Sequence, residues 1–124
     1  MPWDLKSDRP IYAQLIEQIE LKICSGVYAL GSKLPSVREL AQEASVNPNT
    51  MQRALAKLEE SGLVYANRTE GRYVTEDVEM VRNVKNRLAE DLIEEFLQNM
   101  KRLGFSEDEI ITVIKKISGG AMNE

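Results

Sequence analysis

Three polar side chains, those of Asn49, Gln52 and Arg53, combine the chemistry and the spacing needed to contact the edges of nucleic-acid bases. Amide groups match the N6 donor and N7 acceptor of adenine, and a guanidinium matches the O6 and N7 acceptors of guanine. On a helix that advances about 100° per residue, the three side chains point away from an apolar face. That inward face consists of Met51, Ala54, Leu55 and Leu58. The simpler alternative is that the polar residues form only a solvated helix surface.

The helix that would hold these side chains has sequence signals at both ends. Asn47 suits the N-terminal cap, Pro48 suits the first helical position, and Gly62 suits the C-terminal stop. The sequence therefore predicts a helix over residues 48–61.

A shorter helix is expected just before it. Ser36 can cap its N-terminus and Glu39 can complete a capping box, while Pro35 prevents an earlier start. A short turn after Ala44 then leads to the next helix. Two helices joined in this way form a helix-turn-helix, in which the second helix enters the major groove of DNA.

An amphipathic helix precedes this pair. Pro10 suits its first helical position, and Gly26 follows as a stop. Its apolar stripe is Ile11, Leu15, Ile19 and Ile23, widened by Tyr12 and Ile16. We expect Trp3 to pack the preceding arm onto the domain. We expect the single cysteine, Cys24, to be a small buried residue near the end of the helix, with a redox sensor as the minor alternative.

Beyond the helix-turn-helix, the apolar period changes to that of short strands. The β-prone runs are residues 63–66 and 73–75, and the glycine-containing segment between them predicts a two-stranded hairpin. A helix-turn-helix followed by such a hairpin is a winged helix, with residues 67–72 as the wing. Arg68 and Arg72 would give the wing a basic tip. The alternative is a solvated tip, because a glutamate lies between the two arginines.

The rest of the chain returns to helical periodicity. From Val78 onward we predict a helix of about 26 residues, roughly 39 Å long at 1.5 Å per residue. Its apolar stripe includes Val81, Val84, Leu88, Leu92, Phe96 and Met100. A small winged helix cannot cover so long a stripe, so another surface must bury it.

A last helix is predicted after Gly104. Ser106 and Glu109 are spaced as a second capping box. The apolar face of this helix includes Ile110 and Ile114. Residues 119–124 are expected to fray.

Burial of the long stripe against a second copy of the chain explains its length. The alternative is an intramolecular core between the last two helices. We therefore predict a mainly α fold with a small β-hairpin. It would consist of a winged helix-turn-helix domain over residues 1–77 and a helical dimerisation arm over residues 78–124.

Composition excludes several classes of function. The chain has no histidine and one cysteine, so no metal site is expected. The cysteine lacks a basic partner and no glycine-rich phosphate loop is found, so neither an enzyme nor a cofactor is indicated. No apolar run approaches the roughly 20 residues that span a bilayer, and no signal peptide is found. We expect a cytoplasmic protein without a membrane partner.

The net charge of −4 argues at first sight against a nucleic-acid partner. Residues 1–77 hold 9 Lys or Arg against 11 Asp or Glu, so the first domain is not basic overall. Binding to a DNA groove depends on the local electrostatic field of the contacting surface, however, rather than on the net charge. The cations of the suspected segment are Lys33, Arg38, Arg53, Lys57, Arg68 and Arg72. We expect weak non-specific binding with a marked salt dependence.

Together, residues 10–75 resemble the GntR family of bacterial transcription regulators. The matching motifs are PIYAQLIEQIELKICSG, then G-x-x-LPSVRELA, then NPNTMQRALAKLEESGLV, and a glycine-containing wing followed by Tyr73 and Val74. The short two-helix arm resembles the YtrA-type subgroup, whose members lack the large effector domain of their relatives. The resemblance implies a homodimer that binds palindromic double-stranded operator DNA and regulates a nearby operon, often of transporter genes.

The resemblance also implies which residues contact DNA. The positions that match the family's contacts are Ser36, Arg38, Asn49, Thr50, Gln52 and Gly71. For Arg38 the alternative is a surface ion pair with Glu39 or Glu43. Many family members have an arginine where this chain has Pro48, so base reading would fall to Asn49, Gln52 and Arg53.

The leading hypothesis is a homodimeric, sequence-specific DNA-binding regulator that acts as a repressor. The alternative is a winged-helix module that binds protein rather than DNA, which the acidic net charge favours. A purely structural helical dimer would leave the polar face of the third helix unexplained. Paired arm helices leave room for a small-molecule effector, but no charged residue within the stripe marks a site for one.

Overall fold

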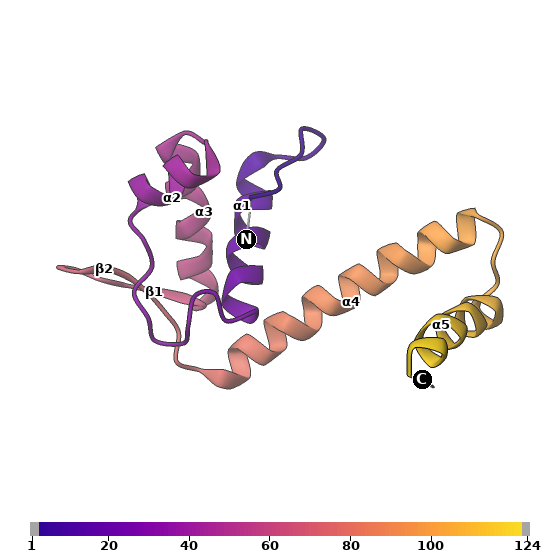
Figure 1. Ribbon diagram of the computed structural model, residues 1–124. Helices are drawn as coiled ribbons and strands as arrows, with labels where there is room; N and C mark the ends of the chain where they lie inside the picture. The colour runs from indigo at the N-terminus through magenta and orange to yellow at the C-terminus, as the bar shows by residue number, and fades with distance from the viewer. Residues whose placement is uncertain (1–2, 123–124) are drawn as a thin grey trace. The chain divides into compact units, whose positions relative to one another are not determined.

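The computed structural model describes residues 3–122, with the backbone alone for residues 120–122. The elements are α1 (Ile11–Cys24), α2 (Val37–Ala44), α3 (Pro48–Ser61), β1 (Val64–Asn67), β2 (Gly71–Val74), α4 (Val78–Arg102) and α5 (Glu107–Met122) (Figure 1). The chain forms two compact units, residues 1–86 and 87–124. These elements confirm the predicted fold class, a mainly α chain with one small hairpin.

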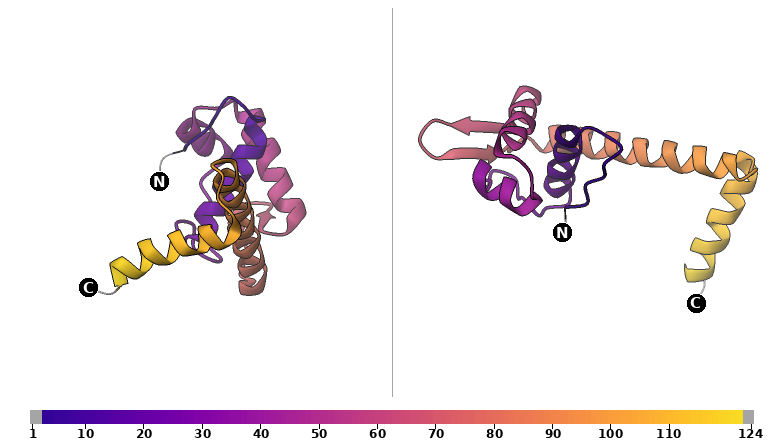
Figure 2. Two further views of the ribbon diagram at one scale, coloured as in Figure 1. Left: turned by 90° about the vertical axis from the view of Figure 1, so that its right-hand side faces the viewer. Right: turned by 90° about the horizontal axis from the view of Figure 1, so that it is seen from above.

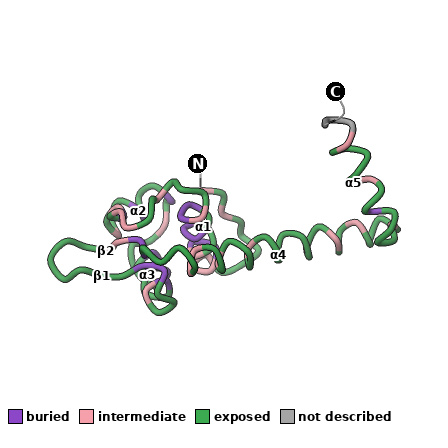
Figure 3. The backbone as a smooth tube through the Cα atoms, turned by 90° about the horizontal axis from the view of Figure 1, so that it is seen from below, coloured by how far each residue is buried: buried purple, intermediate pink, exposed green. Residues whose placement is uncertain are grey.

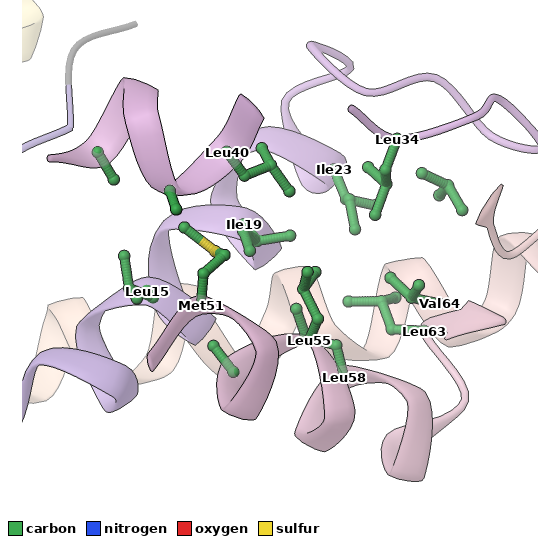
Figure 4. Close-up of a cluster of buried hydrophobic side chains, with 14 residues drawn as sticks. Leu15, Ile19, Ile23, Leu34, Leu40, Met51, Leu55, Leu58, Leu63 and Val64 are labelled. Atoms are coloured by element: carbon green, nitrogen blue, oxygen red, sulfur yellow. The ribbon is translucent and has the colours of Figure 1, made fainter. Parts of the chain in front are cut away.

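The first unit is built from three helices around one apolar core. Both α1 and α2 pack against α3, and the side chains between them come from the predicted apolar stripes (Figure 4). The fully buried side chains include Leu15, Ile19, Leu40, Met51, Leu55 and Leu58. Because Val64 and Val74 are also buried, the base of the hairpin is fixed to the helices. The core thus fixes one face of α3 and leaves the opposite face outward.

Local capping defines the start and end of α3 as predicted. Asn47 is the cap, and its Oδ1 accepts a hydrogen bond from the backbone N–H of Asn49 at 2.7 Å. Pro48 is the first helical residue, and Gly62 ends the helix with a φ of +86°. The expectation for Pro10 is wrong by one residue. Pro10 has a ψ of 133° and is the cap of α1, contributing only its carbonyl group.

The hairpin strands differ slightly from the predicted runs: β1 is shifted by one residue toward the turn, and β2 begins two residues earlier and ends one residue earlier. β1 and β2 pair antiparallel along their full lengths of 4 residues each. The turn is therefore residues 68–70, and the expected wing of residues 67–72 includes the ends of both strands. The tip of the wing carries Arg68, whereas Arg72 lies in β2.

The connection between α1 and α2 adds a second pairing, to β2, that was not predicted from the sequence. Lys33 forms a β-bridge with Tyr73. On either side of it, the Leu34 N–H donates to the Arg72 carbonyl at 2.8 Å, and the Val74 N–H donates to the carbonyl of Ser32 at 2.9 Å. This pairing ties the start of the helix-turn-helix to the wing.

A buried glutamine fixes the arm that precedes α1. Gln14 is 1% exposed, and its side chain exchanges two hydrogen bonds with the backbone of Lys6, both at 2.6 Å. Trp3 and Leu5 pack against the core, as expected for Trp3. The Lys22 Nζ lies 3.9 Å from the centroid of the Trp3 ring, and burial lowers the pKa of Lys22.

The first turns of α4 belong to the first unit. Asp77 caps the helix, since its Oδ1 accepts a hydrogen bond from the Met80 N–H at 3.2 Å. Met80, Val81 and Val84 pack against the core. Cys24 is half-buried rather than fully buried, and its thiol contacts the Val81 carbonyl oxygen at 3.9 Å. Two residues of the predicted dimer stripe, Val81 and Val84, therefore have partners within their own chain.

The second unit consists of the remainder of α4 and of α5. No residue of α4 is fully buried (Figure 3), and α5 leaves the end of α4 in a new direction (Figure 2). The predicted capping box of α5 is present, with the Ser106 N–H donating to Glu109 Oε1 at 2.9 Å and the Glu109 N–H to Ser106 Oγ at 3.3 Å.

One expectation for this unit is corrected, and the alternative of an intramolecular core is not formed. α5 continues to Met122, so residues 119–122 are helical rather than frayed, and residues 123–124 lie outside the described part. The apolar stripe of α4 is not covered by α5, because Leu92 remains 65% exposed. None of the described helices is long and apolar enough to cross a membrane.

Candidate nucleic-acid interface

The outward face of α3 presents the amides that the sequence singles out. Asn49 and Gln52 are exposed, and Thr50 is half-buried. Met51 and Leu55 on the opposite face are at most 1% exposed, so burial fixes the rotation of the helix about its axis. In the described part of the chain, neither amide side chain has a hydrogen-bond partner. Both are therefore available to a ligand outside the chain.

The two basic side chains of α3 have different partners. The guanidinium carbon of Arg53 lies 4.1 Å from the centroid of the Tyr12 ring on α1. The Lys57 Nζ lies 3.5 Å from Glu60 Oε2, one turn further along the same helix. A neighbouring carboxylate offsets the charge of Lys57, whereas an aromatic ring leaves the charge of Arg53 intact.

The start of α2 is fixed by the predicted capping box. The Glu39 N–H donates to Ser36 Oγ at 3.1 Å, and the Ser36 N–H donates to Glu39 Oε1 at 2.9 Å. These hydrogen bonds, together with the nearby charge of Lys33, hold the pKa of Glu39 below its usual range. Ser36 thus positions the helix-turn-helix, and its contact with DNA stays a prediction.

A groove of about 420 Å³ lies between the start of α2 and the wing. It brings together several of the predicted contacts: Ser36, Arg38, Gly71 and Arg72. Arg38 is exposed. Among the ion pairs of the described residues none involves Arg38, so the alternative pairing with Glu39 or Glu43 is not formed.

The two arginines of the wing have different environments. Arg72 pairs through its Nε with Glu59 Oε1 of α3, and its side chain is only 18% exposed. Arg68 is exposed at the turn, and the described residues provide no carboxylate to pair with it. Arg72 therefore fixes the wing to α3, whereas Arg68 extends into solvent.

Gly71 occupies a backbone conformation that other residues rarely adopt. Its φ is +105°, where an L side chain is strained. A Cβ at this position would lie 3.5 Å from the Lys33 Cε. The Lys33 side chain therefore runs beside the wing.

Three contributors to this surface were not predicted from the sequence. Tyr12 was assigned to the core stripe of α1, Lys33 was counted only as part of the local field, and Glu59 was given no role. A tyrosine at the edge of an apolar stripe, with its polar end suited to the surface, was the available signal for Tyr12. Nothing in the local sequence indicates the other two, because their partners lie on other elements.

The predicted dimerisation residues fall into groups by exposure. The most exposed are Leu92, Phe96 and Ile114, at 65%, 41% and 44%. Leu88 and Met100 are half-buried. Those with partners within the chain are Val81, Val84 and Ile110.

The geometry fits a ligand that offers both hydrogen-bonding edges and negative charge. Exposed amides lie on one helix, and unpaired cations lie on that helix, on α2 and on the wing. The described residues contain no group of His, Cys, Asp or Glu side chains that could hold a metal ion. Duplex DNA offers the matching chemistry, with base edges in its major groove and phosphates along its flanks.

Comparison with known proteins gives consistent matches. The family model described as "Bacterial regulatory proteins, gntR family" matches residues 11–74. The chain is 37% identical to the uncharacterized HTH-type transcriptional regulator YhcF of Bacillus subtilis, over 93% of this chain and 95% of the relative. It is 34% identical to the HTH-type transcriptional repressor YtrA of the same organism, over 98% and 97%. These relatives are named as regulators, in agreement with the expectation that the chain is not an enzyme.

Solved structures give the same fold. A GntR family transcriptional regulator from Listeria monocytogenes has a TM-score of 0.81 and 42% identity, over 90% of this chain and 98% of that one. AraR(DBD) in complex with operator ORX1 has a TM-score of 0.53 and 30% identity, over 60% of this chain and 92% of that one.

Proposed function

Because the chain belongs to the gntR family of bacterial regulatory proteins, we propose that it is a homodimeric, sequence-specific regulator that binds operator DNA and represses a nearby operon. The near full-length match to YtrA agrees with the YtrA-type subgroup that its motifs indicate. YtrA is named a repressor, and AraR(DBD) was solved on an operator, and both support the proposal. The proposal includes a cytoplasmic location, because bacterial operator DNA lies in the cytoplasm.

The main support is the outward face of α3, where Asn49 and Gln52 are exposed and without partners in the described chain. An α-helix fits the major groove, where amides discriminate adenine by two hydrogen bonds. We place residues 48–61 in the major groove and the wing, residues 67–72, at the minor groove. The contacts proposed are Ser36, Arg38, Asn49, Thr50, Gln52, Arg53, Lys57, Arg68, Gly71 and Arg72.

Dimerisation is assigned to the arm. The large apolar side chains of Leu92, Phe96 and Ile114 are exposed in the single chain, and burial against a second copy would remove them from water. A two-fold dimer presents its recognition helices to major grooves about 34 Å apart, which suits a palindromic site. We therefore propose residues 1–77 as the DNA-binding domain and residues 78–124 as the dimerisation arm.

The proposal is tested by DNA titration. A palindromic duplex of about 30 base pairs, selected from a randomised pool by the wild-type protein, is labelled and titrated at low salt. We expect saturable binding that Arg38→Ala weakens by about tenfold or more. Arg82→Ala, which removes the same charge from α4 outside the groove, is the matched control and should leave binding unchanged. Failure of the pool to yield any selected sequence would refute the proposal.

The alternative is a winged-helix module that binds protein instead of DNA. The acidic net charge of −4 is the observation in its favour. DNA binding weakens steeply with salt because phosphate contacts release counterions. A target whose binding is indifferent to salt, together with no retention on DNA, would favour the protein-binding alternative.

A further inference from the structure

We propose that Tyr12 and Arg53 form a clamp for one DNA backbone phosphate at the flank of the recognition helix, with Arg53 binding the phosphate and Tyr12 positioning it. The inference rests on the proposed function. It replaces the base-reading role that the sequence predicts for Arg53.

The direction of the Arg53 side chain distinguishes it from the amides of α3. Its guanidinium carbon lies 4.1 Å from the centroid of the Tyr12 ring, so the side chain leans toward α1. A helix with its side chains is about 10–12 Å across, and the major groove is about 12 Å wide. Side chains at the front of such a helix reach the bases, whereas one that leans to the side meets the sugar-phosphate backbone.

The charge of Arg53 is also better suited to phosphate than that of its basic neighbours. Lys57 lies 3.5 Å from Glu60, and Arg72 pairs with Glu59. Within the part of the chain that the structure describes, Arg53 forms no ion pair or hydrogen bond. No carboxylate of the described residues therefore offsets the charge of Arg53.

The contact with the Tyr12 ring leaves the hydrogen-bond donors of Arg53 available. A guanidinium over an aromatic ring uses the face of its plane, and its five N–H donors lie within that plane. A phosphate accepts two such donors side by side, which is a strong and well-oriented contact.

Tyr12 supplies rigidity. It is half-buried at the edge of the α1 stripe, whose neighbouring member Leu15 is fully buried. A fixed ring restricts the rotamers of the arginine before DNA arrives, which lowers the entropy cost of binding. A cation–π contact at an exposed site corresponds to about a two- to fivefold change in an equilibrium constant.

The test measures affinity for two duplexes across a series of KCl concentrations. One is the duplex of about 30 base pairs selected by the wild-type protein, and the other is an unrelated duplex of equal length. Arg53→Ala should weaken binding to both by the same factor and reduce the salt slope by about 0.9 for each recognition helix bound. Gln52→Ala is the comparison variant, and it should weaken binding to the selected duplex only.

The role of Tyr12 is tested by a matched pair of variants and a double-mutant cycle. Tyr12→Leu should weaken binding to both duplexes by about two- to fivefold, and Tyr12→Phe, which keeps the ring, should bind as the wild type does. In an Arg53→Ala background, Tyr12→Leu should have no further effect on affinity. Thermal unfolding of each variant reports separately whether the fold is intact.

Several outcomes would overturn the clamp. If Arg53→Ala weakened binding to the selected duplex only, Arg53 would contact a base rather than a phosphate. Equal losses of DNA affinity in Tyr12→Phe and Tyr12→Leu would show that Tyr12 does not position Arg53. Additive effects of the two substitutions in the double-mutant cycle would show the same. These outcomes all require that the wild-type protein selects a duplex, so they are distinct from failure of the proposed function.

Discussion

The two units of the chain consist of similar amphipathic helices, but they differ in how far the apolar side chains of those helices are buried. In the first unit the apolar side chains of α1, α2 and α3 meet one another, and Leu55 is 1% exposed. In the second unit Leu92 and Ile117 are 65% and 69% exposed. Figure 3 shows the contrast as buried residues in α1–α3 and mostly exposed residues along α4 and α5. One unit completes its own core, whereas the other displays apolar surface of the kind that the proposed dimer would bury.

Local signals do not explain this difference. Both α2 and α5 begin with a Ser-x-x-Glu capping box, and in both the reciprocal hydrogen bonds are formed. The difference is tertiary. α2 packs against α3 and buries Leu40 and Ala41, whereas on the α5 face Ile114 remains 44% exposed.

The largest expected difference between the units comes from removing one leucine side chain from each. Leu55→Ala should lower the free energy of unfolding by about 2–5 kcal/mol, because it leaves a cavity in a closed core. Leu92→Ala removes the same atoms from the second unit and should change the free energy of unfolding of the first unit, which Trp3 reports, by no more than about 0.5 kcal/mol. Urea unfolding followed by the fluorescence of Trp3, the single tryptophan and packed on the first core, measures both. Equal losses in the two variants would contradict the division of the chain.

The next effect concerns association. Phe96→Asp places a charge on the exposed stripe of α4 and should convert the proposed dimer to a monomer, because an unpaired carboxylate is costly to bury. Sedimentation velocity measures the mass, and the Trp3 transition should be unchanged. Operator affinity should fall at least about tenfold, because a monomer contacts one half-site. Glu95→Gln on the neighbouring polar surface is the control and should remain dimeric. A dimer that persists in Phe96→Asp would place the interface elsewhere.

The starts of α2, α3 and α5 were predictable from sequence because capping is local, whereas the end of α5 was not. Ser36 with Glu39, and Ser106 with Glu109, form their hydrogen bonds within one turn, so the residue types are sufficient to predict the starts. The exposed face of α3 was equally predictable, since Met51 and Leu55 fix its rotation. For Pro10 the residue type was suited to either of two adjacent positions, and the chain uses the earlier one.

The pairings between elements were not predictable. The bridge of Lys33 with Tyr73 involves too few residues to show strand periodicity. The contacts of Arg53 with Tyr12 and of Arg72 with Glu59 join residues 41 and 13 positions apart. In the sequence, Arg53, Arg68 and Arg72 look alike as surface cations. Their separation into stacked, paired and unpaired side chains depends on the packing of α1 and the hairpin against α3.

A smaller effect compares the two capping boxes. Ser36→Ala should lower the free energy of unfolding of the first unit by about 1 kcal/mol at every protein concentration, since it leaves an N–H of α2 unpaired. Ser106→Ala should leave the Trp3 transition unchanged and weaken dimerisation instead. The measurements are urea unfolding and sedimentation equilibrium over a range of concentrations. Ser118→Ala, on the exposed side of α5 away from the cap, controls for loss of a hydroxyl. A shift of the Trp3 transition in Ser106→Ala would show that the two units unfold together.

The smallest effect is the pH dependence of the same caps. Hydrogen bonds from Ser36 and Ser106 hold the pKa values of Glu39 and Glu109 below their ordinary value of 4.5. A carboxyl whose folded pKa is lowered contributes stability that is complete above the unfolded pKa and is lost as pH falls through the folded one. Glu39→Gln should therefore lower the melting temperature of the first unit at about pH 6, and the difference from wild type should be smaller at about pH 3. In Glu109→Gln the same pH dependence should appear in dimer affinity, because α5 lies in the unit to which the dimer interface is assigned by proposal. An offset in Glu39→Gln that is equal at both pH values would assign the effect to side-chain geometry rather than to charge.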